Sequence, residues 1–325
     1  MNAQFIEYAR KEEDTLNSTI KSPRDLHNAF FYLKKYHQLY IMLIPAVIFF
    51  LVFCYAPMYG VLIAFKDYNI FRGFSGSKWV GLKHFQSFFK DPFCFRLIRN
   101  TFLLSFYSLL FGFPVPIILS LLFNEVNNAK FKKITQTISY MPHFLSTVVV
   151  VGLISQLTAS SGLFNIIIRV LGGETIAFSN RADLFRPLYI GSGIWQGAGW
   201  GTIIYLASLA GVDPGLYESA TIDGAGRFQK MIYVSLPSIL PVITIQLILN
   251  CGSLLSVGFE KAYLMQNPVI YETADVISTY VYRRGIEGSQ FGYSSAVGLF
   301  NSLVSAALTV TVNFIAGKVG ETTLF

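Results

Sequence analysis

The sequence predicts an all-α protein that crosses a lipid bilayer several times. Of its 325 residues, 53% are hydrophobic and only 13% are charged, whereas soluble domains carry about 25% charged residues. A helix needs roughly 20 apolar residues to cross the hydrocarbon of a bilayer. Because lipid offers backbone groups no partner, and the alternation of a β-barrel is absent, each long apolar stretch is predicted to be a helix. Six stretches without Asp, Glu, Lys or Arg predict a six-transmembrane-helix bundle: Ile41–Phe65, Thr101–Asn124, Ile134–Ile168, Pro187–Val212, Met231–Phe259 and Gly288–Gly317.

The polar segments at the two ends divide the chain into regions. Residues 1–21 are polar and of mixed charge, which predicts a mobile N-terminus. Ser22-Pro23-Arg24-Asp25 has the pattern of a capping box with Pro at the first helical position. Residues 22–39 are therefore predicted to form an interfacial helix, with an extension of the first span as the alternative. The transmembrane domain covers residues 40–317, and residues 318–325 form a short tail.

Composition and missing motifs exclude several functions. Cys54, Cys94 and Cys251 have neither the number nor the spacing of a disulfide framework or a metal site. The net charge of +7 comes from basic residues scattered among loops, so no nucleic-acid partner is expected. No Gly-rich loop ends in Gly-Lys-Ser or Gly-Lys-Thr, so the chain is not expected to bind ATP in that way. The sequence has no cluster of His, Cys and carboxylate residues that would indicate hydrolysis or a metal site, so the chain is not expected to be an enzyme.

A polar segment between the fourth and fifth stretches has the pattern of a short helix, a turn and a second helix. Asp213 can cap the first helix, and Pro214 suits its first position, which needs no backbone N–H. Gly224 suits the turn that ends this helix, since glycine enters the left-handed conformation without steric cost. A second helix runs to Pro237, where the next apolar run begins. Residues 213–237 are therefore predicted to form a helical hairpin at the membrane surface.

This hairpin resembles the EAA loop of binding-protein-dependent ABC importers, the segment through which the membrane subunit meets the ATPase. The family pattern is Glu-Ala-Ala, then Gly, and Leu-Pro after a spacer. Ser219 stands where the family has its first Ala, a small-for-small change that leaves room for close packing. A hairpin without any partner is the alternative. The expected ATPase-coupling residues are Glu218, Ser219, Ala220, Asp223, Gly224, Ala225, Leu236 and Pro237.

Further segments are similar to the carbohydrate-type permeases of these importers, and the resemblance covers about residues 30–325. They include Tyr55–Gly60, Ala64–Asn69, Trp79–Leu82, Ile194–Trp200, Tyr205–Ala207, Gly258–Glu260, Gly298–Asn301 and Leu324–Phe325. Among such permeases the chain looks closest to those that carry oligo- and polysaccharides, as the alginate importer does. The resemblance implies the type I ABC importer permease fold and transport by alternating access.

The resemblance also implies several partners. They are a second homologous permease subunit, expected to form a heterodimer with this chain, two cytoplasmic ATPase subunits, an extracytoplasmic solute-binding protein and a saccharide. ATP and Mg would be bound by the ATPase subunits, so no cofactor is expected on this chain. The implied location is the bacterial cytoplasmic (inner) membrane, with the hairpin and both termini on the cytoplasmic side.

Loop charges do not decide this orientation. The segments assigned to the cytoplasm carry 12 Lys and Arg, and those assigned to the outside carry 13. The positive-inside rule therefore does not decide the orientation. Acidic residues number ten and eight on the two sides, which leaves the outer side the more basic. The excess indicates an anionic partner there, such as an acidic saccharide or an acidic docking face, with random loop charge as the alternative.

The translocation path is expected to be lined by polar and aromatic side chains of the spans. Amide groups and aromatic faces suit sugars. The alternative for each residue is a hydrogen bond between helices, worth roughly 1 kcal/mol. The candidates are Gln156, Gln196, Tyr205, Gln246, Asn250, Ser253, Asn301 and Asn313.

Two other classes of membrane protein compete with this interpretation. An ion-coupled secondary transporter needs a titrating group at membrane depth, and within the six stretches only His143 offers one. The two halves also show no inverted repeat. A non-transporting scaffold predicts no ATPase partner, so co-purification with a nucleotide-binding subunit would separate it from a permease.

Overall fold

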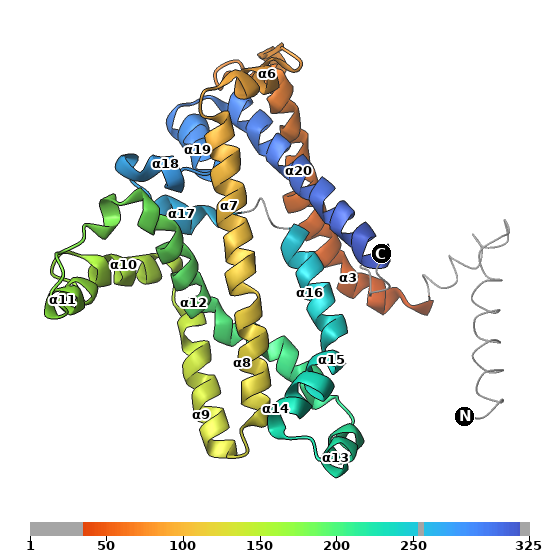
Figure 1. Ribbon diagram of the computed structural model, residues 1–325. Helices are drawn as coiled ribbons and strands as arrows, with labels where there is room; N and C mark the ends of the chain where they lie inside the picture. The colour runs from red at the N-terminus through yellow and green to blue at the C-terminus, as the bar shows by residue number, and fades with distance from the viewer. Residues whose placement is uncertain (1–34, 253–256, 319–325) are drawn as a thin grey trace. The chain divides into compact units, whose positions relative to one another are not determined.

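The computed structural model describes residues 35–252 and 257–318 of the chain (Figure 1). The chain divides into two compact units, one ending at Leu62 and one beginning at Ile63. The mobile N-terminus predicted for residues 1–21 lies outside the described residues. So do most of the predicted interfacial helix (residues 22–34), candidate path residue Ser253, and the tail after Lys318.

The described part of the first unit, residues 35–62, contains most of the first predicted span. Helix α3 (His37–Phe49) continues through a π-helical turn (Phe50–Tyr55) into α4 (Ala56–Met58). A 3-10 segment (Tyr59–Phe65) then leads into the second unit. The whole segment His37–Phe65 is long and apolar enough to cross a membrane. The helix predicted for residues 41–65 is therefore confirmed, with irregular turns near Pro57.

The second unit begins with short elements that precede the next long helix. Strands β1 (Lys66–Asp67) and β2 (Lys78–Trp79) form an antiparallel pair in which Lys66 lies opposite Trp79 and Asp67 opposite Lys78. Helix α5 (Gly73–Gly76) connects these two strands. The amphipathic helix α6 (Lys83–Lys90) follows and packs against α20 (Phe291–Lys318).

Three helices form the centre of the second unit. Helix α7 (Cys94–Gly112) runs almost without interruption into α8 (Pro114–Glu125), because Pro114 occupies an N-terminal position of α8 where no N–H is needed. Helix α12 (Ala182–Ala210) packs along both α7 and α8. Helix α9 (Ala129–Tyr140) packs against α12 (Figure 1).

The third predicted stretch does not form one continuous helix. Helix α9 ends at Tyr140, and Pro142 lies in a 3-10 turn (Met141–Phe144). Leu145 is extended, and Ser146 caps α10 (Thr147–Thr158) by accepting the Val149 N–H at 3.4 Å. A second break at residues 159–162 precedes α11 (Leu163–Val170). Proline and a capping serine interrupt the helix because each supplies or removes a local hydrogen-bonding group.

The fifth predicted stretch is helical but bent. Helix α14 (Arg227–Lys230) continues through a π-helical turn (Met231–Ser235) into α15 (Leu236–Ser238). Helix α16 (Leu240–Gly252) then departs at 61°. The break at Ile239 lies two residues after Pro237, which explains its position.

Short helices join α16 to the last long helix. They are α17 (Phe259–Met265), a 3-10 turn (Pro268–Ile270), α18 (Tyr271–Ala274), α19 (Ile277–Tyr282) and a π-helical turn (Arg283–Glu287). In Figure 1, α6 and α19 lie at one end of the second unit and α13 (Pro214–Ile222) at the other.

The described residues contain four segments long and apolar enough to cross a membrane, or five if the bent pair is one span. They are His37–Phe65, Cys94–Glu125, Thr147–Val170 and Phe291–Ile315, with Arg227–Gly252 as the bent pair. Helix α12 has 29 residues, or about 43 Å at 1.5 Å per residue. Its Gly, Gln and Trp residues lower its hydropathy, so it does not meet the same criterion. The helical membrane fold is confirmed, apart from the short strand pair β1 and β2, whereas the number six stays a prediction.

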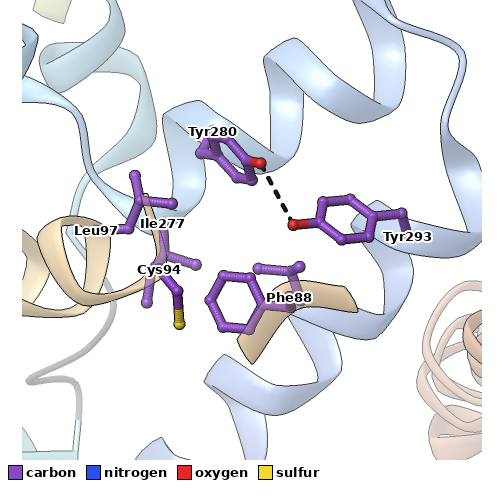
Figure 2. Packing of buried hydrophobic residues seen from close by; sticks show 7 residues of the cluster. Phe88, Cys94, Leu97, Ile277, Tyr280 and Tyr293 are labelled. Carbon is purple, nitrogen blue, oxygen red and sulfur yellow. Dashed lines mark hydrogen bonds between the residues drawn. The ribbon is translucent and has the colours of Figure 1, made fainter. Parts of the chain in front are cut away.

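A buried cluster fixes α6, α7, α19 and α20 to one another (Figure 2). Phe88, Leu97 and Ile277 are almost fully buried in it. At its edge, the Tyr280 hydroxyl lies 3.3 Å from that of Tyr293 and donates to Asp91 at 2.5 Å. Burial alone would raise the pKa of Asp91, but hydrogen bonds from the two tyrosines and the Phe93 N–H, with Arg284 nearby, lower it.

Close contact between α9 and α12 depends on Gly199. A Cβ atom at this position would lie 2.0 Å from the backbone oxygen of Ser139. We expect Gly199→Ala to destabilise the folded protein by about 1–3 kcal/mol, because backbone cannot move aside as a flexible side chain can. The thermal unfolding midpoint of the purified protein would measure the effect. Gly191→Ala is the matched control on the same helix, since its Cβ would meet nothing within 4 Å. Equal midpoints for both variants would contradict the prediction.

Candidate functional site

The predicted hairpin is present, and its first helix has the predicted ends. The Asp213 side chain accepts the Gly215 N–H at 2.9 Å, and Pro214 is the first residue of α13. Past the helix end, Gly224 has φ +79°. Its N–H donates to the Thr221 oxygen at 3.1 Å, and the next N–H donates to the Ala220 oxygen at 2.9 Å. This pair of hydrogen bonds is the Schellman arrangement that a left-handed glycine permits.

Side chains tie the two arms of the hairpin together. The hydroxyl groups of Tyr217 and Ser235 lie 2.9 Å apart, and Ser235 is buried. The Lys230 ammonium donates to Thr221 Oγ1 at 3.3 Å. The Gln229 side chain accepts the Gly226 N–H at 2.7 Å, which caps the second arm. The hairpin is therefore a connected unit and not a loose loop.

The hairpin presents an exposed surface of mixed character. Glu218, Ser219, Asp223 and Gly224 are exposed, whereas Ala220 and Ala225 are partly buried. No Lys, Arg or His nitrogen of the described residues lies within 4.0 Å of either carboxylate. Large apolar side chains of the same hairpin are also exposed, namely Leu216, Ile222, Phe228 and Tyr233. Exposed apolar side chains together with unpaired carboxylates are typical of a surface that binds a protein.

The second arm of the hairpin leads directly into the core. Leu236 and Met231 pack against a buried cluster that includes Ile117, Tyr205 and Ile239. Pro237, which is exposed, lies at the start of α15 just before the 61° bend. A displacement of the hairpin would therefore be transmitted to α8 and α12, because well-packed side chains do not yield independently.

A cavity of about 830 Å³ lies between α7, α8, α12 and α16, within the 300–1,000 Å³ range of ligand pockets. Its walls combine hydroxyl, amide and aromatic groups with aliphatic side chains. The polar and aromatic residues that line it are Ser105, Ser108, Phe113, Tyr189, Trp200, Tyr205, Gln246 and Asn250. This lining can hydrogen-bond sugar hydroxyls and stack against sugar rings.

A second cavity of about 420 Å³ shares Ser108, Gly112, Pro116 and Tyr189 with the first. The two cavities therefore adjoin along α7, α8 and α12. Gln196 and Lys261 also line the second cavity. Of the described residues that line either cavity, Lys261 alone carries a charge.

The structure separates the candidate path residues into groups. Tyr205, Gln246 and Asn250 line the first cavity, and Gln196 lines the second. Gln196 also donates to the Leu145 oxygen at 3.0 Å, which satisfies a carbonyl freed by the break between α9 and α10. The remaining described candidates, Gln156, Asn301 and Asn313, line neither cavity.

Lys261 is a site residue that sequence reasoning missed. It lies in α17, outside the six predicted spans. Its ammonium donates to the backbone carbonyl oxygen of Tyr189 at 2.8 Å. The same ammonium lies 4.6 Å from the centre of the Tyr189 ring. Burial lowers the pKa of Lys261 to about 8. The available signal was its place directly after Gly258–Glu260, a segment that resembles the family.

A buried ionic network was also missed. Asp275 is fully buried and accepts from Arg283 at 2.6 Å and from Thr279 at 2.9 Å, with Arg96 at 3.6 Å. Asn100, also fully buried, donates to the backbone oxygens of Glu272 and Asp275. These contacts join α7 to the segment between α18 and the π-helical turn. Within the described part of the chain, no group of three or more His, Cys, Asp or Glu residues is placed to hold a metal ion.

The chain matches known transport proteins along most of its length. Residues 94–319 match the family described as "Binding-protein-dependent transport system inner membrane component". The polygalacturonan/rhamnogalacturonan transport system permease protein YteP of Bacillus subtilis (strain 168) is 50% identical over 284 residues, which cover 87% of this chain and 88% of YteP. Protein LplB of the same organism is 48% identical over 90% of this chain and 92% of its own length.

Solved structures agree with these relatives. A crystal structure of a bacterial ABC transporter involved in the import of the acidic polysaccharide alginate matches with a TM-score of 0.84 and 40% identity, covering 90% of this chain and all of that one. A structure of a bacterial alginate transporter in complex with an alginate pentasaccharide-bound periplasmic protein matches equally well, over 91% and 99% of the two chains. With its helical hairpin and central cavity, the chain belongs to the family of inner membrane components of binding-protein-dependent transport systems.

Proposed function

We propose that this chain is the permease subunit of an ATP-driven importer of acidic oligo- or polysaccharides. The observation that carries the proposal is the likeness to the alginate importer over 90% of the chain at 40% identity. The relative YteP is named for two further acidic polymers, polygalacturonan and rhamnogalacturonan. A substrate that contains uronic acids is common to these names.

The cavity supports a saccharide as the transported molecule. Trp200 and Tyr189 offer aromatic faces, and Gln246 and Asn250 offer amides. Sugars present hydroxyl groups around an apolar ring face, so this combination binds them without a single strong contact. Weak and distributed contacts also suit transport, because a molecule that binds too tightly does not leave.

The hairpin supports coupling to a separate ATPase. In this proposal α13 docks into a cleft of an ATPase subunit, where Glu218 meets a basic residue and the small Ser219 and Ala220 allow close approach. Asp223, Gly224 and Ala225 set the turn, and Leu236 and Pro237 join the hairpin to the core. The partner subunits bind ATP and Mg²⁺, and this chain contributes no catalytic residue.

Transport then follows from the mechanical connection. When the ATPase subunits close, each hairpin moves with its ATPase, and the helices packed on the second arm move with the hairpin. This chain and a second permease subunit would enclose the path together. The cavity would open first toward the solute-binding protein and later toward the cytoplasm. Both chain termini and the hairpin lie on the cytoplasmic side in this arrangement.

Stimulated ATP hydrolysis tests the substrate class. The complete complex, reconstituted in liposomes, would be mixed with solute-binding protein loaded with uronic-acid oligosaccharides or with neutral oligosaccharides of equal length. We expect the acidic ligands to stimulate hydrolysis several-fold more than the neutral ones. Equal stimulation by acidic and neutral ligands would overturn the proposal that the substrate is acidic. Failure of the chain to co-purify with a nucleotide-binding subunit would favour a non-transporting scaffold, and uptake without ATP would favour a secondary transporter.

A further inference from the structure

The charge of the two adjoining cavities is unusual for a path through a membrane. Of the described residues that line them, none is acidic and Lys261 alone is basic. A lone charge beside a largely apolar cavity is costly unless an opposite charge visits it. The position of Lys261 is therefore a place where a negatively charged ligand would be stabilised.

Lys261 is held firmly at the second cavity. Its neighbour Ala262 is fully buried in a cluster with Leu104 and Phe185, which fixes α17 against α7 and α12. Gly193 leaves room for the ammonium, since a Cβ atom there would lie 3.3 Å from Nζ. The direction of the ammonium is thus set by the fold before any ligand arrives.

The ammonium keeps capacity for a ligand. It has three N–H donors, and one of them goes to the Tyr189 oxygen at 2.8 Å. No carboxylate of the described residues lies within 4.0 Å of it. With a pKa of about 8 the group carries its charge at neutral pH, and a bound anion would stabilise that charge further.

We propose that Lys261 binds a carboxylate of the saccharide as it passes through the cavities, and so favours acidic over neutral substrates. This inference rests on the proposed function, because it needs a saccharide in the path. Tyr189, whose ring lies against the ammonium and lines both cavities, would contact the sugar ring that carries the carboxylate.

A purely structural role for Lys261 makes a different prediction. The hydrogen bond to Tyr189 joins α17 to α12, and a lysine that served only this purpose would affect all substrates equally. Lys261→Gln retains a donor for the backbone oxygen of Tyr189 and removes the charge, whereas Lys261→Arg keeps the charge. Lys66 is the matched control residue, since its ammonium also donates to a backbone oxygen at 2.8 Å and lies 4.1 Å from the Phe74 ring. Lys66 lines neither cavity.

Uptake by the complete complex in proteoliposomes tests the inference. The substrates are a uronic-acid oligosaccharide and the same oligosaccharide with its carboxylates methyl-esterified, each delivered by saturating binding protein. We expect Lys261→Gln to lower the acid-to-ester uptake ratio about tenfold, the loss of one charge-assisted hydrogen bond. Lys261→Arg and Lys66→Gln should keep the wild-type ratio, and basal ATP hydrolysis should stay unchanged in the control variant Lys66→Gln.

Each alternative outcome has one interpretation. An unchanged ratio in Lys261→Gln, or an equal loss for acid and ester, would overturn the inference and leave the proposed function intact. Failure of the wild-type complex to import the acid would instead overturn the proposed function. If Lys261→Gln does not assemble, Gly193→Ala replaces it, because its methyl group would displace the ammonium by a few tenths of an ångström. We expect a smaller fall in the same ratio there, and no fall would again overturn the inference.

Discussion

Replacing Gly224 with Asp is expected to leave the permease folded and assembled but to uncouple ATP hydrolysis from transport. Gly224 has φ +79°, and a Cβ atom there would meet nothing within 4 Å. The substitution therefore creates no clash. It places a residue in the left-handed region, at a cost of about 1–2 kcal/mol, and adds a second carboxylate beside Asp223. The turn would change its angle on the surface that we propose meets the ATPase, and uptake in membrane vesicles should fall to background while hydrolysis persists.

Gly172→Asp provides the control for this experiment. Gly172 has φ +83°, and its Cβ would also meet nothing within 4 Å. The two variants thus carry the same backbone strain and the same added charge, and only one lies in the hairpin. Vesicles containing Gly172→Asp should retain uptake. Normal uptake by Gly224→Asp would remove the hairpin from the coupling mechanism.

Asp275→Asn is expected to destabilise the permease strongly. The Asp275 side chain has no exposed surface and lies within salt-bridge distance of Arg283 and Arg96. Removing its charge leaves two partly buried guanidinium groups without a counter-charge, and breaking such a buried pair costs about 3–5 kcal/mol. The unfolding midpoint of the purified permease in detergent should fall further for Asp275→Asn than for Gly199→Ala.

A surface pair gives the comparison. Asp183 pairs with Arg181, and both side chains are more than half exposed. Asp183→Asn removes the same charge from an aspartate–arginine pair in water, where screening and side-chain mobility make such pairs weak. We expect no measurable change in its unfolding midpoint. If the two variants unfold at the same temperature, the buried network does not hold α7 to the segment after α18.

The candidate site divides between what local pattern predicts and what it does not. Asp213, Pro214 and Gly224 act within a few residues of themselves, so their capping and turn roles followed from residue type. Gln196 was predicted as a path residue on residue type alone. In the structure it lines the second cavity and also bonds the Leu145 oxygen, 51 residues away. No sequence pattern in either segment predicts the hydrogen bond between Gln196 and Leu145.

The sequence by itself determined the helical membrane class, the six apolar stretches and the hairpin with its glycine turn. These features depend on transfer of side chains into lipid and on local backbone geometry, which each segment carries within itself. Only the tertiary structure decided which polar residues reach the cavities and which charges are buried. Lys261 meets Tyr189 across 72 residues, and Asn100 meets Asp275 across 175. Contacts over such separations depend on how the helices pack, because that packing alone sets which distant side chains share a space.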